Sequence, residues 1–520
     1  MAMASNSAVV VPLPPTNTLR LTKRRWDRAV PVPPILRPLV RAYLLGYAST
    51  VAPRLLTLLL KHATLLISRR RSLTGPEPTP EKLQRRHNYE TLLDSFQQIL
   101  RGGLDPRRFP TFCALLVGGS TLLEIPLLTA LDKLAQGRAL SDVSSKRLAR
   151  LLASLTAAWF SLRLLQSKQS PAFVETVPAP SDKPPGVELQ TITHAGRTLD
   201  LTLFAFTRAL DVLIGTLWAR RKARRLASHR WSALDQAISH LTDPALFAAS
   251  SGLVMWAWFY NPSALPRAYN KWITSAAAVD PRLISALQHC RAGTLRYGTD
   301  TGLSSVLTPM CIDHDFPPSW GDPSVSIPFP CALVHMGRGG ASCEAHAASR
   351  FARAFAWSMS TYLPLSLLLA LRSRSRTARS ALVSAARSSA FLATFIALFY
   401  YGVCLARTRV GPRVLGRDVE SCQRIDGGLC VAAGCALCGW SILLEQEGRR
   451  KDIMLFVAPR ALATLLPRRY DVGKEWRERA VFAASAAVAM TAAREDGGMM
   501  TRRQLNVAFH NMIPVSKKNQ

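Results

Sequence analysis

The sequence predicts an all-α, polytopic helical membrane protein with an internal duplication of a multi-helix module, about eight to ten apolar helices in all. Three observations support this fold class. Hydrophobic residues make up 48% of the 520 residues and the mean hydropathy is +0.10, yet the net charge is +33. The apolar residues gather in separate blocks of membrane length, with arginine and lysine between them. The two halves of the chain also contain similar segments in the same order.

The apolar blocks give the expected positions of the helices. A helix needs about 20 residues to cross the hydrocarbon core, with about 17 at the lower limit. Blocks without any charge cover residues 244–260, 354–371, 388–406 and 427–444. Blocks with one to three charges cover residues 42–60, 110–131, 148–165 and 199–219. Residues 454–467 and 480–493 are shorter, so each would also fit a helix that lies in the membrane interface.

Three pairs of segments indicate the duplication. Residues 41–60 resemble 353–371, residues 201–210 resemble 453–462, and ALFAASSGLVM (245–255) resembles AVFAASAAVAM (480–490). Repeated modules of several helices are common in membrane transport folds. The expected organisation is a disordered basic N-terminal tail (1–34), a first membrane module (35–275), an irregular insert (276–347), a second module (348–512) and a C-terminal tail (513–520).

The charges between the blocks favour an even number of crossings in each module. The link after the first helix is basic in both modules, at residues 61–71 and 372–379, and so is the link before the last helix, at 220–225 and 468–474. Under the positive-inside rule, equivalent basic links face the same side of the membrane. We therefore expect four crossings per module, with a fifth segment lying flat or half-buried.

The insert contains the densest group of metal-ligating side chains in the chain. Its many prolines argue against long helices. Within PCALVHMGRGGASCEAH (330–346), the candidate ligands are Cys331, His335, Cys343 and His346. Two thiolates and two imidazoles satisfy tetrahedral zinc, and the glycines at 337, 339 and 340 allow the loop to fold back. We expect this loop to cap a helix that begins near Phe351.

Two other interpretations of this loop stay open. A disulfide could join Cys331 to Cys343 or Cys311 to Cys331 in an oxidising compartment, or the side chains could simply pack. The ten cysteines show no pairing pattern of a secreted framework, so reduced thiols are expected. Cys430, Cys435 and Cys438 have the spacing of a plant-type ferredoxin, but they lie in an uncharged helix rich in small residues. These three are expected to be packing residues.

Charged side chains inside apolar blocks form a second group of candidates. A charge that faces lipid is costly, so such a residue faces the bundle interior, pairs with another charge or reaches the headgroups. Arg208 and Asp211 are three residues apart and can neutralise each other, while Arg208 and Arg460 occupy equivalent places in the two modules. The alternatives are a polar path or anionic-ligand site between the modules, and charges that lie at the membrane surface. The intramembrane polar candidates are Arg54, Glu124, Arg163, Arg208, Asp211 and Arg460.

Two other classes of function have less support in the sequence. No hydrolase, kinase, Rossmann or P-loop pattern occurs, so the chain is not expected to be an enzyme. The alternative function is a basic nucleic-acid-binding protein, because RRKARR (220–225) could neutralise phosphates. Such proteins rarely carry repeated apolar blocks of membrane length, so no nucleic-acid partner is expected.

The chain resembles the transmembrane protein 135 family. In that family's cysteine-rich N-terminal domain, a Cys-x3-His and a later Ser-Cys precede the first helix, and Cys331, His335 and Ser342-Cys343 match this order. Residues 250–272 (SSGLVMWAWFYNPSALPRAYNKW) resemble the family's glycine-containing helix that ends in aromatic residues. That helix type links the family distantly to the inner-membrane preprotein translocase channel family. Met336 stands where the family often has proline, and the cysteine-rich stretch lies mid-chain here.

The resemblance implies an integral protein of a peroxisomal or mitochondrial membrane, with a scaffold or transport-like role linked to lipid metabolism or organelle dynamics. Membrane lipids and other organelle-membrane proteins are the partners it implies. It carries over no catalytic residue, and zinc at the cysteine-rich loop is the only cofactor under consideration.

Overall fold

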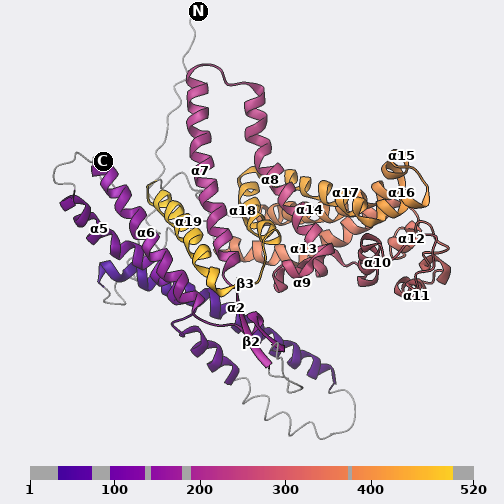
Figure 1. The fold of residues 1–520 in the computed structure, drawn as a ribbon, viewed down its shortest axis with the longest axis horizontal. Helices are drawn as coiled ribbons and strands as arrows, with labels where there is room; N and C mark the ends of the chain where they lie inside the picture. The colour runs from indigo at the N-terminus through magenta and orange to yellow at the C-terminus, as the bar shows by residue number, and fades with distance from the viewer. Residues whose placement is uncertain (1–32, 73–93, 135–141, 179–188, 373–376, 496–520) are drawn as a thin grey trace, which may run out of the picture. The chain divides into compact units, whose positions relative to one another are not determined.

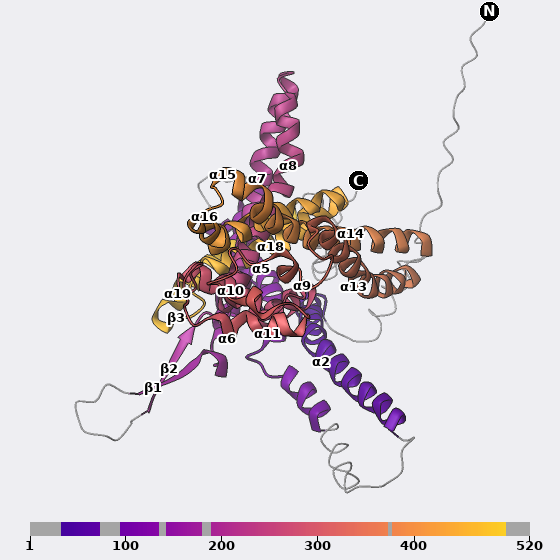
Figure 2. The ribbon, with the colours of Figure 1, turned by 90° about the vertical axis from the view of Figure 1, so that its right-hand side faces the viewer.

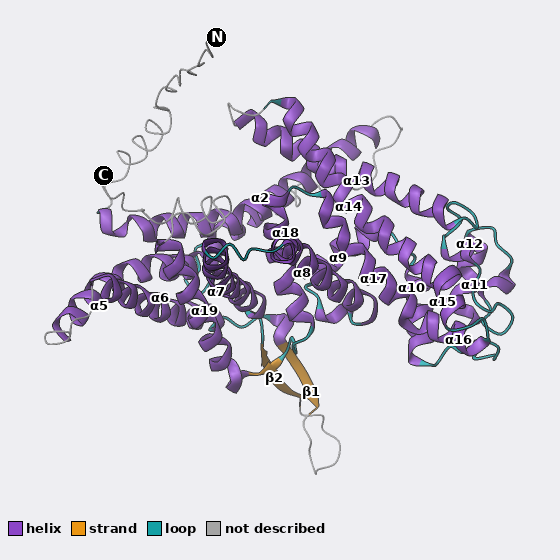
Figure 3. Cartoon of the chain, turned by 90° about the horizontal axis from the view of Figure 1, so that it is seen from above, coloured by secondary structure: helices purple, strands orange, loops and turns teal. Residues whose placement is uncertain are grey.

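The computed structural model describes residues 33–72, 94–134, 142–178, 189–372 and 377–495, and these residues are almost entirely helical (Figures 1 and 3). The expected C-terminal tail and nearly all of the expected N-terminal tail lie outside the described residues. The chain divides into two compact units, residues 1–161 with 506–520, and residues 162–505. The all-α fold class predicted from the sequence is confirmed.

Six helical segments among the described residues are long and apolar enough to cross a membrane. They are Phe109–Leu134, Asp142–Gln166, Leu199–Ala227, Cys343–Leu371, Ala378–Val414 and Val419–Leu444. Half or less of the apolar stretch in each segment is buried inside the protein. Exposed apolar surface of this extent requires lipid around it, so the chain is an integral membrane protein.

The unit formed by residues 1–161 is built on close contacts between helices. Helix α2 (Arg37–Ser72) packs on α4 (Phe109–Cys113) and on the π-helical turn η2 (Ala114–Gly119) that follows it. A side chain at Gly118 would meet the Cα of Leu39 at 2.7 Å, so only glycine permits this approach. Helix α5 (Ser120–Leu134) is joined to the first half of α6 (Asp142–Gln166) by an ion pair between Glu124 and Arg150.

The other unit contains the last turn of α6 and all later described elements. A small antiparallel sheet has the order β1 (Val174–Pro178), β2 (Leu189–Ala195), β3 (Tyr470–Asp471). The long helices are α7 (Leu199–Ala227), α8 (Ala233–Tyr260), α13 (Cys343–Arg372), α14 (Ala378–Leu405), α17 (Cys430–Cys438), α18 (Glu447–Thr464) and α19 (Glu475–Glu495). Helices α13 and α14 lie side by side as an antiparallel hairpin (Figure 2).

Helices from the two expected modules pair crosswise in this unit. Helix α7 packs against α19, where the buried Glu478 accepts hydrogen bonds from Thr198 (2.5 Å) and Thr202 (2.9 Å). Helix α8 packs against α18 and α17. Two long helices of the first module thus pack with helices of the second, and the compact units do not follow the expected module boundaries. The duplication itself stays a prediction from the sequence pairs.

The insert is ordered and has its own core, rather than being irregular throughout. It contains α10 (Pro281–Ala292), α11 (Ser304–Asp313) and the short α12 (Cys331–Val334), and it follows α9 (Arg267–Ala277). Buried side chains of these helices, including Leu283, Leu307 and Leu333, form a separate hydrophobic cluster. Many prolines stand at helix starts, as Pro281 and Pro330 do, where a missing backbone N–H costs nothing. The prolines therefore shorten the helices without preventing them.

Candidate functional site: a cavity and a cysteine cluster

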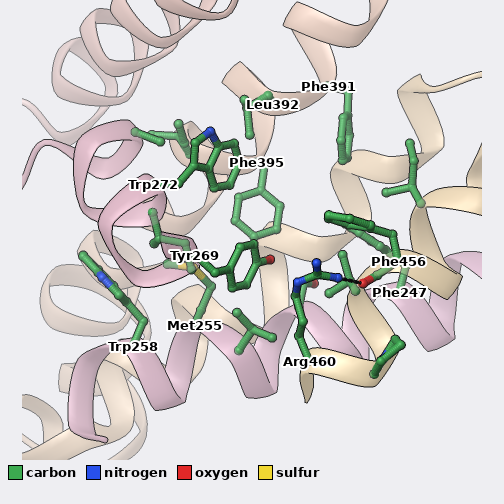
Figure 4. Close-up of a pocket in the computed structure, with 18 of the residues that line it drawn as sticks. Phe247, Met255, Trp258, Tyr269, Trp272, Phe391, Leu392, Phe395, Phe456 and Arg460 are labelled. Carbon is green, nitrogen blue, oxygen red and sulfur yellow. Dashed lines mark hydrogen bonds between the residues drawn. The ribbon is translucent and has the colours of Figure 1, made fainter. Parts of the chain in front are cut away.

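A cavity of about 1190 Å³ lies between α7, α8, α9, α14 and α18. Its wall is mostly aromatic and aliphatic, and Figure 4 shows the rings of Phe247, Phe395, Tyr269 and Phe456 turned toward one space. The other labelled lining residues are Met255, Trp258, Trp272, Phe391, Leu392 and Arg460. This volume slightly exceeds the roughly 300–1,000 Å³ of ordinary small-ligand sites.

Helical periodicity explains how the sequence builds this wall. On α8, the lining residues Phe247, Ser251, Val254, Met255 and Trp258 recur at three- and four-residue steps. On α14, lining positions 388, 391, 392, 395, 396 and 399 follow the same rule. Such positions share one face of an α-helix. Both stripes lie in the uncharged blocks 244–260 and 388–406. The sequence thus identified the two helices, but it did not show that a cavity lies between them.

Arg460 is a cation in this apolar wall. Its guanidinium lies 3.8 Å from the centre of the Phe456 ring and 5.1 Å from that of Tyr269, and it donates a hydrogen bond to the carbonyl of Phe456. Among the described residues, no carboxylate lies within ion-pair distance of it. Burial raises the pKa of the Tyr269 hydroxyl, and Arg460 partly opposes that effect. The guanidinium of Arg460 is therefore stabilised by two aromatic rings and a backbone carbonyl oxygen.

Arg208 lines the same cavity, with its guanidinium 5.3 Å from the centre of the Phe204 ring. The two arginines that occupy equivalent places in the sequence pairs thus reach one space. A further polar group on the wall was missed by sequence reasoning. The hydroxyl of Ser388 donates to the buried Glu445 (2.8 Å), which also faces Arg449 at 3.7 Å. Glu445 and Arg449 lie between two apolar blocks in the sequence. Charged residues in such a position are typical of a solvent-exposed loop, so they gave no signal of a cavity.

The other intramembrane polar candidates lie elsewhere. Asp211 forms an ion pair with Lys451 of α18 at 2.6 Å, and it also interacts electrostatically with Arg208. The side-chain nitrogen of Lys451 reaches Asp211 because α18 packs along α7. Glu124 pairs with Arg150 at 2.7 Å, while Arg54 and Arg163 are exposed. Of the six candidates, Arg208 and Arg460 line the cavity.

The second site is a cluster of thiols and imidazole at the insert. One ligand atom each from Cys331, His335 and Cys343 lies within 4.8 Å of the other two. Cys331 begins α12, His335 follows that helix directly, and Cys343 begins α13. Helix α13 therefore starts eight residues before the expected position near Phe351.

Cys404, near the end of α14, completes this cluster. Its sulfur lies 3.3 Å from Nε2 of His335, and its thiol also interacts with that of Cys343. Sequence reasoning missed Cys404 because it lies in the apolar block 388–406, far from the loop in sequence. A lone cysteine in such a block is indistinguishable from a packing residue.

His346 occupies a different position from the one expected of a ligand. Its ring stacks on that of His335 with centroids 4.1 Å apart, and its Nδ1 lies 3.1 Å from the carbonyl oxygen of Arg338. It is not a member of the cluster of converging ligand atoms. His346 thus stacks on the face of the His335 ring, while the sulfur of Cys404 lies beside the ring nitrogen Nε2.

The glycine-rich loop between these ligands folds back as the sequence predicts. Gly337, Gly339 and Gly340 all have positive φ angles, and so does Met336. A side chain at Gly339 would meet the backbone nitrogen of His346 at 2.5 Å. The fold-back brings the carbonyl of Gly340 to 2.8 Å from Nδ1 of His335. The role expected of these glycines is confirmed.

All ten cysteines are free in the structure. Cys430, Cys435 and Cys438 are buried in the main hydrophobic cluster, and Cys311 is buried in the cluster of the insert. Burial raises the pKa of the Cys331 thiol, which Arg407 partly opposes, and burial lowers the pKa of His335. Burial thus favours the neutral imidazole of His335, the form that can donate a nitrogen lone pair to a metal ion.

No family model, curated protein or solved structure matches this chain. The resemblance to the transmembrane protein 135 family accordingly stays a prediction drawn from the quoted motifs. Functional inference rests on the geometry of the cavity and of the cysteine cluster.

Proposed function

We propose that this integral membrane protein binds an amphipathic, anionic lipid in the aromatic cavity and has a transport-like role in lipid handling. The observation that carries the proposal is Arg460, a cation without a carboxylate partner among the described residues, set among aromatic side chains of a mostly apolar wall. The motif resemblance supports a peroxisomal or mitochondrial membrane as the location. The proposal assigns no reaction to the chain.

The chemistry of the wall selects the ligand class. An extended apolar chain would pack against Phe247, Phe391 and Phe395, because aromatic and aliphatic surface excludes water. A carboxylate or phosphate at the end of that chain would find Arg460, which offers charge-assisted hydrogen bonds from a weakly hydrated guanidinium. A cationic or neutral head group would lack this contribution. A fatty acid or an anionic phospholipid fits both requirements.

Non-specific filling of the cavity by bilayer lipid is the competing explanation. Spaces between membrane helices hold acyl chains without any function, and such lipid would not depend on Arg460. The two explanations differ in how binding responds to the charge of the head group. The test therefore compares an anionic probe with a neutral probe of the same chain length.

Trp258 and Trp272 line the cavity and provide the signal. The full chain in detergent micelles is titrated with a bromine-labelled fatty acid, whose bromine atoms quench tryptophan fluorescence on contact. The matched neutral probe is the methyl ester of the same acid. We expect saturable quenching by the acid with the native chain and about tenfold weaker binding with Arg460→Leu, the loss of one charge-assisted contact. The ester should bind both proteins equally.

Arg413→Leu is the control variant, because Arg413 is exposed on a short helix away from the cavity. It should bind the acid as the native chain does. Equal quenching by acid and ester in the native chain would show non-specific filling and contradict the proposal. Unsaturable quenching in every variant would contradict it as well.

A further inference from the structure

We propose that Cys331, His335, Cys343 and Cys404 form a mononuclear tetrahedral zinc site that ties the insert to the open end of the α13–α14 hairpin. This site is independent of the lipid proposal, because none of its four residues lines the cavity. The inference rests on convergence of four ligand side chains from separate elements, on the hydrogen bond that orients His335, and on the place of the cluster in the fold.

Three of the four ligand atoms converge on one another, and the fourth, Sγ of Cys404, lies beside the imidazole nitrogen of His335. Zinc bonds of about 2.0–2.1 Å to nitrogen and 2.3 Å to sulfur place tetrahedral ligand atoms roughly 3.5–3.8 Å apart. Nε2 of His335 and Sγ of Cys404 are 3.3 Å apart, and Cys331, His335 and Cys343 converge within 4.8 Å. Binding of one ion by all four requires a side-chain rotation that brings Sγ of Cys404 toward the point on which the other three ligand atoms converge. Each coordinating thiol would release its proton to solvent as the metal binds.

The imidazole of His335 is oriented as a zinc ligand. Its Nδ1 lies 2.8 Å from the carbonyl oxygen of Gly340, so this nitrogen carries the proton and donates it. The lone pair of Nε2 is then directed at the thiols. Metal-bound histidines almost always donate their other N–H to a carbonyl or carboxylate in this way. His335 is 1% exposed, which protects such a site from water and competing ligands.

The ligand set and spacing select the metal. Three thiolates and one imidazole are typical of structural zinc sites. A two-iron cluster would hold its ligands on two separate iron atoms and would need the pairs of ligands farther apart than 4.8 Å. Monovalent copper also favours thiolates, so the identity of the metal is part of the test.

The position of the site indicates its role. Cys343 begins α13 and Cys404 lies near the end of α14, so both stand at the end of the hairpin opposite its connecting segment. Cys331 and His335 come from the insert. A bound ion would therefore clamp the two helix ends to each other and to the insert. This is a structural role, in which metal binding contributes directly to folding stability.

The first experiment measures metal in the full chain purified with a tag that lacks histidine. Elemental analysis under reducing conditions should find one zinc per chain. Cobalt exchanged into the site should show the intense visible bands of tetrahedral cobalt and thiolate-to-cobalt charge transfer with the intensity of three thiolates. A two-thiolate intensity would overturn the assignment of Cys404, and one copper per chain would overturn zinc.

Variants supply an independent test. Cys404→Ser should lose the zinc, while Cys435→Ser, which changes a buried cysteine in the helical core, should retain it. His346→Gln should also retain one zinc, because His346 is not a ligand in this assignment. Loss of zinc in His346→Gln together with retention in Cys404→Ser would overturn the proposal. A Cys331–Cys343 disulfide detected by mass spectrometry without reductant, or native chain free of metal after incubation with zinc, would overturn it too.

Discussion

At the scale of single residues, a buried ion pair between Arg407 and Asp426 leads to the clearest prediction of stability. Arg407 and Asp426 have 5% and 1% of their side chains exposed, and they form a two-bond contact at 2.6 and 2.9 Å. Arg407 also donates to the carbonyl of Phe329, and the hydroxyl of Tyr297 donates to Asp426. The pair thus joins the insert to the segments after α14 and before α17. Removal of either charge alone would leave the other one buried without its partner.

Removal of one partner should be strongly destabilising. We expect Arg407→Met or Asp426→Leu to lower the free energy of unfolding by about 3–5 kcal/mol, because each leaves an uncompensated buried charge. The double variant should recover part of that loss, since only the contacts to Phe329 and Tyr297 stay unsatisfied. Thermal or denaturant unfolding in detergent micelles measures the difference.

Arg424 and Glu420 provide the matched control for this prediction. They form an exposed pair one helical turn apart, with 64% and 72% of their side chains accessible. Arg424→Met should change the unfolding free energy by less than about 1 kcal/mol. A loss at Arg407 no greater than the loss at Arg424 would show that the buried pair contributes no more than a surface contact.

At the scale of helices, glycine determines how closely α14 and α17 approach. A Cβ at Gly402 would lie 2.9 Å from the Cα of Gly434, and a Cβ at Gly434 would lie 2.8 Å from the carbonyl oxygen of Phe399. Two glycines on facing helices let the backbones pack directly, as small residues do in membrane bundles. This contact sets the position of Phe399 and the other α14 residues that line the cavity.

Gly434→Ala and Gly215→Ala form a matched test of this close approach. Gly215 also lies in a helix, but a Cβ there would meet no atom within 4 Å. Alanine favours a helix over glycine by about 1 kcal/mol, so Gly215→Ala should be neutral or stabilising. Gly434→Ala should instead destabilise by about 1–3 kcal/mol, because overpacking outweighs the helix propensity. Equal melting temperatures for both variants would refute the close-packing argument.

At the scale of the whole molecule, the exposed apolar surface of the helices requires a membrane. Leu365, Leu368 and Leu371 on α13 are 54%, 65% and 86% exposed, and Ile214 and Leu217 on α7 exceed 60%. The basic stretch 220–225 (RRKARR) lies in the last turns of α7, where cationic side chains can contact anionic headgroups. The expectation that the chain has no nucleic-acid partner stays a prediction.

Alkaline carbonate treatment of membranes from cells that express the chain tests this assignment. The protein should stay in the pellet, because its helices are held by apolar contact with lipid and not by charge. Release into the supernatant, with heparin binding that weakens steeply as salt rises, would favour the nucleic-acid alternative. A peripheral control protein bound only by charge should be released under the same conditions.

The sequence by itself determined the class of the molecule and the local chemistry of its sites. Apolar blocks near 20 residues identify membrane helices because bilayer thickness sets their length. Cys331, His335 and Cys343 lie within one short segment of the sequence. The glycines between them indicate that the chain reverses direction there, so the local sequence predicts that the three side chains come together. Arg460 was also detectable, since a cation in an apolar block is rare.

Only the tertiary structure decided which distant residues meet. Cys404 reaches His335 because α14 runs back along α13 and ends beside the insert. The packing of α18 against both α7 and α8 places Arg208 and Arg460 on one cavity. Helical periodicity shows which face of a helix is apolar, but every apolar face can pack against several others. The choice among them depends on close contacts such as Gly402 against Gly434 and on pairs such as Asp211 with Lys451, whose partners are far apart in the chain.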